Sequence, residues 1–163
     1  MDIPEPAIRP VEILGFSGEY RFLSNFHPVA INYGGHIYGS TESAYQAAKC
    51  KNPEEAKTFV GISPGVAKRK GRAIELREDW NAIKDSVMME LTLLKYQNKE
   101  LAEQLLQTGN AYIEETNVWH DMYWGVDAKT GKGKNKLGII LMTVRGILGG
   151  HGITEKTLDS ITK

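Results

Sequence analysis

The chain has 163 residues, 41% of them hydrophobic and 25% charged, close to the composition of ordinary globular domains. Twenty basic and twenty acidic residues give a formal net charge of zero, which argues against a protein whose main task is to coat nucleic acid, although not against a local basic patch. The single cysteine, Cys50, excludes an internal disulfide and a cysteine-rich zinc site.

Three prolines in residues 1–10 predict a flexible N-terminal arm, and this segment lacks the character of a signal peptide. A single domain is expected over residues 11–150, followed by a polar C-terminal tail at residues 151–163. Because no apolar run has membrane-spanning length, we expect no membrane contact and a cytoplasmic location.

The first part of the domain combines strand and loop signals. Residues 11–16 are typical of a short strand, and residues 29–38, with two glycines at their centre, are typical of a β-hairpin with a primed turn. Residues 18–26 are too polar for a core strand and too aromatic for an ordinary loop.

Helical signals then dominate the chain. Thr41, Ser63 and Asp79 are expected N-caps, and one more short strand is expected at residues 111–116. Caps, prolines at helix starts and apolar periodicity together predict helices at residues 42–50, 53–59, 64–72, 80–94, 99–108 and 137–148. These elements predict a single-domain α+β fold that is mostly α-helical, with a few short β-strands.

The stretch from Tyr123 to Leu141 joins aromatic rings, an acid and a turn rich in glycine and lysine to the start of an apolar helix. Gly125 and Gly133 would let the backbone approach a ligand. Asn135 is expected to cap the helix, and anions bind well at such an N-terminus. The pattern indicates a nucleotide or sugar-phosphate site, or alternatively a plain surface turn that leads into a helix.

Among candidate chemistries, metal catalysis is disfavoured because the four histidines lack paired spacing, and we expect neither a metal nor a cofactor. Acid chemistry remains, because several acids, Glu42 and Asp127 among them, lie where loops meet helices or strands. Two acids that flank a sugar C1 are what glycosidic cleavage needs, and nearby aromatic rings would desolvate them. A solvated cap is the simpler explanation for any one of these acids taken singly.

Five motifs match one known family in order and spacing. They are Phe22-x-Ser24-Asn25-Phe26, Tyr38-x-x-Thr41-Glu42-x-x-Tyr45-Gln46-x-x-Lys49, Ala67-x-Arg69-x-Gly71-Arg72, Leu76-Arg77-x-x-Trp80, and Tyr123-Trp124-Gly125 with Gly131-x-Gly133-x-Asn135-x-Leu137-Gly138. On these motifs the chain resembles the NADAR superfamily, also called YbiA-like N-glycosidases, over nearly its whole length.

The resemblance implies a small, mostly helical YbiA-like fold and hydrolysis of an N-glycosidic bond. It implies one of two substrate classes, either phosphoribosylamino-pyrimidine intermediates of riboflavin biosynthesis or ADP-ribose attached to guanine in DNA, RNA or a nucleoside. The second class would also imply a genetic pairing with an ADP-ribosyltransferase toxin. Both classes join ribose C1 to nitrogen near a phosphate, so the expected ligand is of the ADP-ribose or ribose-phosphate type.

Carried over by position, the resemblance implies that Glu42 is the catalytic glutamate and that Trp124 and Asp127 are further catalytic candidates. Relative to the bacterial YbiA-like members, one residue is inserted before Asp127. The candidates for substrate binding are Arg21, Phe22, Ser24, Asn25, Phe26, Tyr45, Lys49, Arg69, Gly125, Gly133 and Asn135.

The resulting hypothesis is a metal-independent N-glycosidase. Glu42 would orient or activate a water molecule, or hold the oxocarbenium charge, and Asp127 would assist. The substrate would stack near Trp124 and Phe22. Lys49 could hold a Schiff base or bind phosphate, and a role through its charge is favoured. The alternative is a non-catalytic module that binds ADP-ribose or an NAD derivative.

Overall fold

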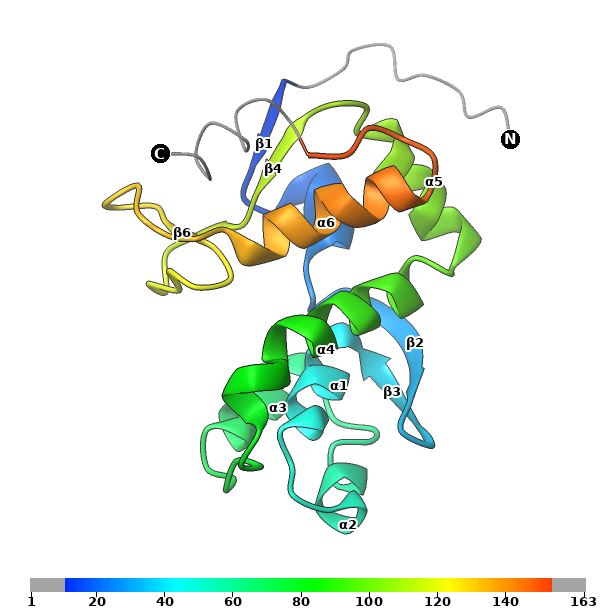
Figure 1. Cartoon of the computed structure of the whole chain (residues 1–163), viewed down its shortest axis with the longest axis vertical. Coiled ribbons are helices and arrows are strands. Elements are labelled where there is room, and N and C mark those ends of the chain that lie inside the picture. The colour runs from blue at the N-terminus through cyan, green and yellow to red at the C-terminus, as the bar shows by residue number, and fades with distance from the viewer. Residues whose placement is uncertain (1–10, 154–163) are drawn as a thin grey trace. The chain divides into compact units, whose positions relative to one another are not determined.

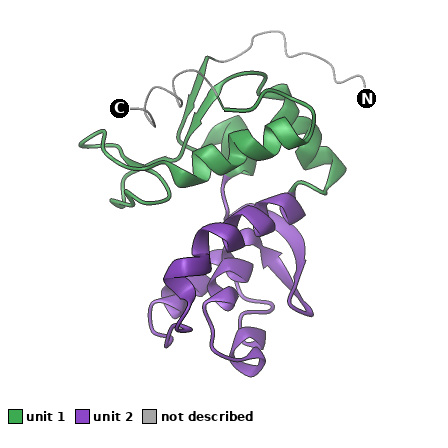
Figure 2. Ribbon diagram, viewed as in Figure 1, with its two compact units in different colours: residues 1–23, 96–163 green, residues 24–95 purple. Residues whose placement is uncertain are grey.

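The computed structural model describes residues 11–153, so the predicted arm at 1–10 and most of the predicted tail lie outside the described residues. The described chain divides into two compact units (Figure 2). Residues 24–95 form one, the middle unit, and residues 11–23 together with 96–153 form the other, the terminal unit. Both contain helices and short strands, which confirms the predicted α+β class (Figure 1).

The middle unit begins with the predicted β-hairpin. Strand β2 (Pro28–Tyr33) pairs antiparallel with β3 (His36–Ser40), with Ile31 opposite Tyr38. Gly34 and Gly35 connect the strands at φ values of 59° and 85°, the left-handed region that a primed two-residue turn requires. Ile31 and Tyr38 are both buried, so the hairpin packs one face into the core of this unit.

Helix α1 (Thr41–Ala48) follows directly and is buried at all eight positions. Its N-cap is Ser40 rather than the predicted Thr41, because the Ser40 hydroxyl accepts a hydrogen bond from Ser43 N at 3.1 Å. Helix α1 contacts α3 (Pro64–Gly71) and α4 (Trp80–Lys95). It is therefore the enclosed central helix of the middle unit, and its polar side chains need partners from the protein.

The remaining helices of this unit largely match the prediction. Ser63 caps α3 as expected, and Asn52 caps the short helix α2 (Pro53–Lys57). Asp79, the expected cap of α4, pairs its carboxylate with the Arg77 guanidinium at 2.6 Å. The buried positions of α4 are Trp80, Val87, Met88, Leu91, Thr92 and Lys95. The apolar residues at helical spacing, Trp80, Ile83, Val87, Leu91 and Leu94, predict a different face, because Ile83 and Leu94 are only half-buried whereas Met88 and Lys95 are buried.

The terminal unit combines two parallel strand pairs with helices. Residues 18–26, which fitted neither a core strand nor an ordinary loop, begin with a 3-10 helix, and the strand predicted at 111–116 is split into β4 and β5. Strand β1 pairs with β4, β5 pairs with β6, and α6 packs on β4 and α5. The elements are β1 (Glu12–Leu14), η1 (Gly18–Leu23), α5 (Lys99–Gln107), β4 (Tyr112–Glu114), β5 (Thr116–Asn117), β6 (Val126–Asp127) and α6 (Lys136–Ile147).

None of the helices within residues 11–153 is both long and apolar enough to cross a membrane.

Arg145 anchors the end of α6 although its side chain is fully buried. Its guanidinium donates hydrogen bonds to the Thr108 hydroxyl at 2.9 Å, to the Ala111 carbonyl at 2.9 Å and to the His151 carbonyl at 2.6 Å. Burial lowers the pKa of this guanidinium to about 10. The hydrogen bonds compensate for the lost hydration and connect α6 to the chain that leads into β4.

Close contact between α6 and β4 depends on Gly138. A Cβ added there would overlap the Ile113 carbonyl and the Asn135 side chain. Gly65 in α3 offers a matched comparison, because it is also helical and a Cβ added to it would meet nothing within 4 Å.

We expect Gly138→Ala to lower the free energy of unfolding by about 1–3 kcal/mol, because the backbone carbonyl of Ile113 cannot move aside without separating α6 from β4. The control Gly65→Ala should leave stability unchanged or raise it by up to about 1 kcal/mol, since alanine favours helices. Urea unfolding of both variants measures the difference, and equal stabilities would contradict the close-packing explanation.

Candidate active site

Glu42 lies in the first turn of α1 and is only 8% exposed. Its backbone N–H donates to the Asn25 carbonyl at 3.0 Å. Its carboxylate oxygen Oε1 accepts a hydrogen bond from Gln46 Nε2 at 2.8 Å, one helical turn further on. The predicted catalytic acid is therefore a nearly buried carboxylate whose orientation is set from its own helix.

The turn that begins at Ser24 belongs to the same unit. The Ser24 carbonyl accepts a hydrogen bond from Lys95 Nζ at 2.9 Å, and its hydroxyl accepts one from Phe26 N at 3.1 Å. Asn25 Nδ2 lies 3.5 Å from the sulfur of Met88 on α4. Because the Asn25 carbonyl also binds Glu42 N, the structure brings the predicted residues of this turn to the start of α1.

Positive charges from three helices act on this region. Burial lowers the pKa of Lys49, Glu42 raises it, and the charges of Arg72, Lys68 and Lys84 lower it further. We call Lys49, Lys68, Arg72 and Lys84 the basic cluster. The predicted contact Arg69 is exposed on α3, between two members of the cluster. The four-residue spacing of Lys68 and Arg72, which puts them on one helix face, is the sequence signal that could have identified them.

Aromatic rings in the middle unit have different surroundings. Lys68 Nζ lies 5.8 Å from the centroid of the half-buried Phe26 ring. Tyr45 is 6% exposed and packs on Trp80 of α4, with ring centroids 5.2 Å apart. Tyr45 therefore supports the packing of α1 on α4, whereas Phe26 is the more accessible ring.

The other predicted residues lie in the terminal unit. Phe22, the predicted stacking ring, is only 5% exposed, and its neighbour Arg21 is exposed on η1. Trp124 is half-buried, and its ring meets Tyr123 edge to face at 4.9 Å. The Asp121 carboxylate accepts hydrogen bonds from Tyr123 N at 3.0 Å and Trp124 N at 2.9 Å, which sets the backbone position of the tryptophan.

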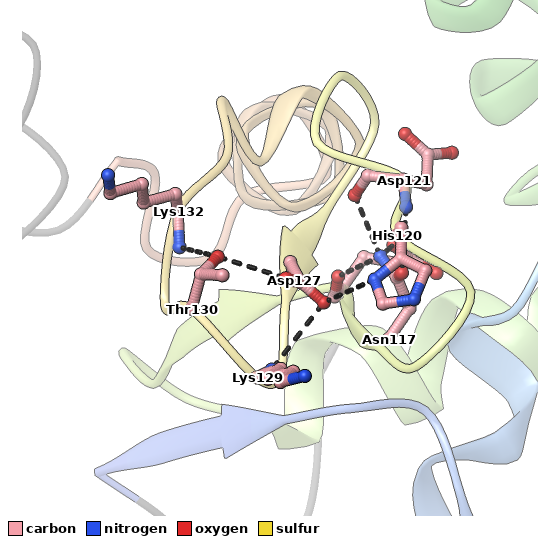
Figure 3. A network of polar contacts seen from close by, with 8 residues as sticks. Asn117, His120, Asp121, Asp127, Lys129, Thr130 and Lys132 are labelled. Atoms are coloured by element: carbon pink, nitrogen blue, oxygen red, sulfur yellow. Dashed lines mark hydrogen bonds and ion pairs between the residues drawn. The ribbon is translucent and has the colours of Figure 1, made fainter.

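Asp127 is enclosed in a local polar network (Figure 3). It is 3% exposed, and its carboxylate contacts His120 Nδ1 at 3.1 Å and accepts from the Thr130 hydroxyl at 2.9 Å. Burial raises the pKa of Asp127, but the hydrogen bonds from Thr130 and His120 outweigh it and hold this pKa below its ordinary value. The contact of His120 with Asp127 was not predicted, because two loop residues seven positions apart leave no periodic signal in the sequence.

Gly125, Gly133 and Asn135 pack the same loop. A Cβ at Gly125 would overlap Glu115, and one at Gly133, where φ is 152°, would overlap the Gly125 carbonyl. Asn135 occupies the N-cap position of α6, but the predicted capping bond is wrong. Its side chain instead accepts from Glu115 N at 3.0 Å and donates to the Ile113 carbonyl at 2.9 Å. Backbone packing of the loop is therefore enough to explain why glycine or asparagine stands at each of these three positions.

The described residues offer little support for cysteine or metal catalysis. Cys50 is buried, and burial raises the pKa of its thiol to about 11, which disfavours the reactive thiolate. Across residues 11–153, no group of three or more His, Cys, Asp or Glu side chains is arranged to hold a metal ion.

Comparison with known proteins places the chain in a family. The NADAR domain model matches residues 15–149, so the chain belongs to the NADAR family. N-glycosidase YbiA of Escherichia coli is 36% identical over 133 residues, covering 79% of this chain and 82% of the relative. The NMR structure of E. coli YbiA aligns with a TM-score of 0.76 and 33% identity, over 87% of this chain and 88% of that one.

These relatives confirm the predicted resemblance and the YbiA-like fold. Relatives named N-glycosidases are hydrolases of N-glycosyl bonds, in agreement with the predicted class of enzyme. The riboflavin biosynthesis protein VVA0006 of Vibrio vulnificus is 37% identical over 134 residues, which cover 80% of this chain and 36% of that protein.

The buried Lys95 generates a pH-dependent prediction. Burial lowers its pKa to about 7, whereas a lysine in an unfolded chain titrates near about 10.4. Between these values the unfolded chain binds more protons, so the free energy of unfolding should rise with pH by up to about 1.4 kcal/mol per unit. Lys95→Met keeps the apolar stem and should remove this part of the slope. Urea unfolding at pH 7, 8 and 9 tests it, and an unchanged slope would contradict it.

The Asp127 network generates a second prediction. Since the pKa of Asp127 is lowered in the fold, its contribution to loop order is complete above the ordinary value of about 3.9 and is lost only as pH falls below it. Amide NMR signals of residues 127–132 should therefore shift together below about pH 3.9. Asp127→Asn should abolish this titration. A midpoint above that value would show that the network does not favour the carboxylate.

Proposed function

We propose that the chain hydrolyses the bond between ribose C1 and nitrogen in a substrate that carries phosphate near the ribose. One observation carries this proposal: within the middle unit, the nearly buried carboxylate of Glu42 is held by Gln46 and interacts with Lys49, on which the other members of the basic cluster also act. A carboxylate and a group of cations are what an anionic N-riboside requires.

Glu42 would serve the bond-breaking step. As the C1–N bond breaks, its electron pair leaves with nitrogen and positive charge develops on the sugar ring. A fixed carboxylate that is largely removed from water stabilises this charge more strongly than a solvated one. The same carboxylate can accept a proton from the water whose oxygen bonds to C1. Both roles need the ionised form of Glu42.

The basic cluster would bind the phosphate groups. Arg72 can present two parallel N–H donors to a phosphate, and the three lysines act as point charges. Phe26 offers a ring on which a base could stack, next to Lys68. Ser24, Asn25 and Arg69 remain predicted contacts of the substrate.

The residues of the terminal unit remain predicted site residues, with one refinement. The Asp127 carboxylate already contacts the His120 ring and accepts a hydrogen bond from the Thr130 hydroxyl. We therefore propose that Asp127 assists by ordering its loop rather than by transferring a proton. Trp124 is held by Asp121 at the start of that loop, as a stacking residue would need to be.

Two substrate classes share the required chemistry. The name of the Vibrio relative supports a phosphoribosylamino-pyrimidine of riboflavin biosynthesis. The resemblance to NADAR proteins also implies ADP-ribose attached to guanine. A parallel assay of both substrates, the second as nucleoside and as modified DNA, distinguishes the two classes.

We expect the wild-type chain to release the base from at least one of these substrates. Glu42→Gln should lower kcat by about 10²–10⁴-fold, because the amide neither accepts the proton nor carries charge. Binding of ADP-ribose or ribose 5-phosphate, measured by calorimetry, should be retained. Glu54→Gln is the control, because Glu54 is an exposed glutamate in the first turn of α2.

Undiminished turnover by Glu42→Gln would remove Glu42 from the mechanism. Tight binding of ADP-ribose by the wild type, without release of product from either substrate, would instead support the non-catalytic binding module.

A further inference from the structure

We propose that Gln46 is a positioning residue for Glu42 and that Gly71 provides the space which keeps Gln46 in place. This inference rests on the proposed catalytic role of Glu42. It assigns a task to two residues that do not themselves need to touch the substrate.

The contact between the two side chains is short and enclosed. Gln46 Nε2 donates to Glu42 Oε1 at 2.8 Å, and the two residues are 4% and 8% exposed. They lie four positions apart on α1, so the rigid helix backbone fixes their spacing. A neutral amide donates this bond at any pH, so the carboxylate keeps one orientation over the range in which an enzyme works.

Gly71 explains why the amide stays where it is. A Cβ at Gly71 would overlap the Oε1 and Cδ atoms of Gln46. Gly71 lies in the last turn of α3 and is not among the glycines with positive φ, so its backbone conformation does not require glycine. Glycine is less favourable than alanine within a helix, and the space for Gln46 is a direct reason for it.

Stability does not explain a glutamine at this position. The Gln46 amide oxygen is buried, and it finds no hydrogen-bond partner among the described residues. A buried polar atom without a partner costs stability, whereas an apolar side chain of similar size would avoid that cost. The amide is therefore best explained by the bond that its other end makes to Glu42.

The electrostatic surroundings define how the pair can be tested. Lys49, the C-cap of α1, interacts with Glu42 and with three other cations, Lys68 and Arg72 on and beside α3 and Lys84 on α4. Apart from Glu42 this set is cationic, so a carboxyl group introduced at position 46 would be its only new anion. Comparison with the wild type, which carries the same cations, separates its effect on Glu42 from theirs.

The test compares Gln46→Met, Gln46→Glu and Gly71→Ala with the wild type, and Gly65→Ala is the control for a helical glycine with open space. For whichever substrate the wild type hydrolyses, kcat and KM are measured from pH 4 to 9. Gln46→Met should lower kcat by roughly tenfold or more with KM within about twofold, because orientation is lost while phosphate binding is kept. Gly71→Ala should lower kcat in the same direction, and Gly65→Ala should not.

Gln46→Glu provides the readout that a merely structural role would not change. When protonated, the introduced carboxyl can donate to Glu42 as the amide does, so activity should approach that of the wild type in acid. As pH rises the two carboxylates repel each other, and kcat should fall where the wild-type profile stays level. An equal loss at every pH, or an unchanged kcat in Gln46→Met, would overturn the positioning role.

A measurement without substrate separates this inference from the proposed function. In a ¹³C NMR titration, the midpoint of the Glu42 carboxyl signal should move to higher pH in Gln46→Met, because a donor to the charged form is lost. An unchanged midpoint would overturn the coupling between the two residues. If the wild type hydrolyses neither substrate, the proposed function fails, while this titration still decides whether Gln46 controls Glu42.

Discussion

The carboxylate of Glu42, nearly removed from water on a fully buried helix, is the constraint on which the middle unit depends. Burying a charge is expensive unless hydrogen bonds and opposite charges replace the lost hydration. Gln46 supplies such a bond, and Lys49 supplies an opposite charge. The tight approach of α3 at Gly71 follows from the same requirement, because it encloses the amide that holds the acid.

In the terminal unit, a long irregular loop around β5 and β6 must be ordered with very little secondary structure. Its strands β5 and β6 have two residues each, so the ladder between them cannot fix the loop alone. Polar side chains bound to the backbone do so instead: Asn117 and Asp121 hold the turn before Trp124, and Asn135 joins the loop to β4. Such side-chain bonds compete with regular structure and are well suited to stabilising turns.

Two buried basic residues play comparable parts in the two units. Lys95 places its ammonium on the Ser24 carbonyl, and Arg145 places its guanidinium on carbonyls near the start of β4 and beyond the end of α6. In each case burial lowers the pKa because it disfavours the charged form, and the hydrogen bonds to carbonyl oxygens offset part of that cost. Both residues anchor segments whose carbonyl groups no helix or strand satisfies.

The sequence by itself determined the elements that depend on local physics. The hairpin at Gly34-Gly35 and the cap at Ser63 were predicted because neighbouring residues control backbone conformation there. The motif around Glu42 also identified the family, which the comparisons confirm. The particular catalytic and binding roles remain proposals.

Tertiary structure alone decided which side chains share an environment. Apolar periodicity could not predict the burial of Lys95, since its partner is a carbonyl 71 positions away. Periodicity also could not show that the His120 ring contacts the Asp127 carboxylate, or that Gly71 lies against Gln46. Contacts between separate segments leave no periodic pattern in the chain.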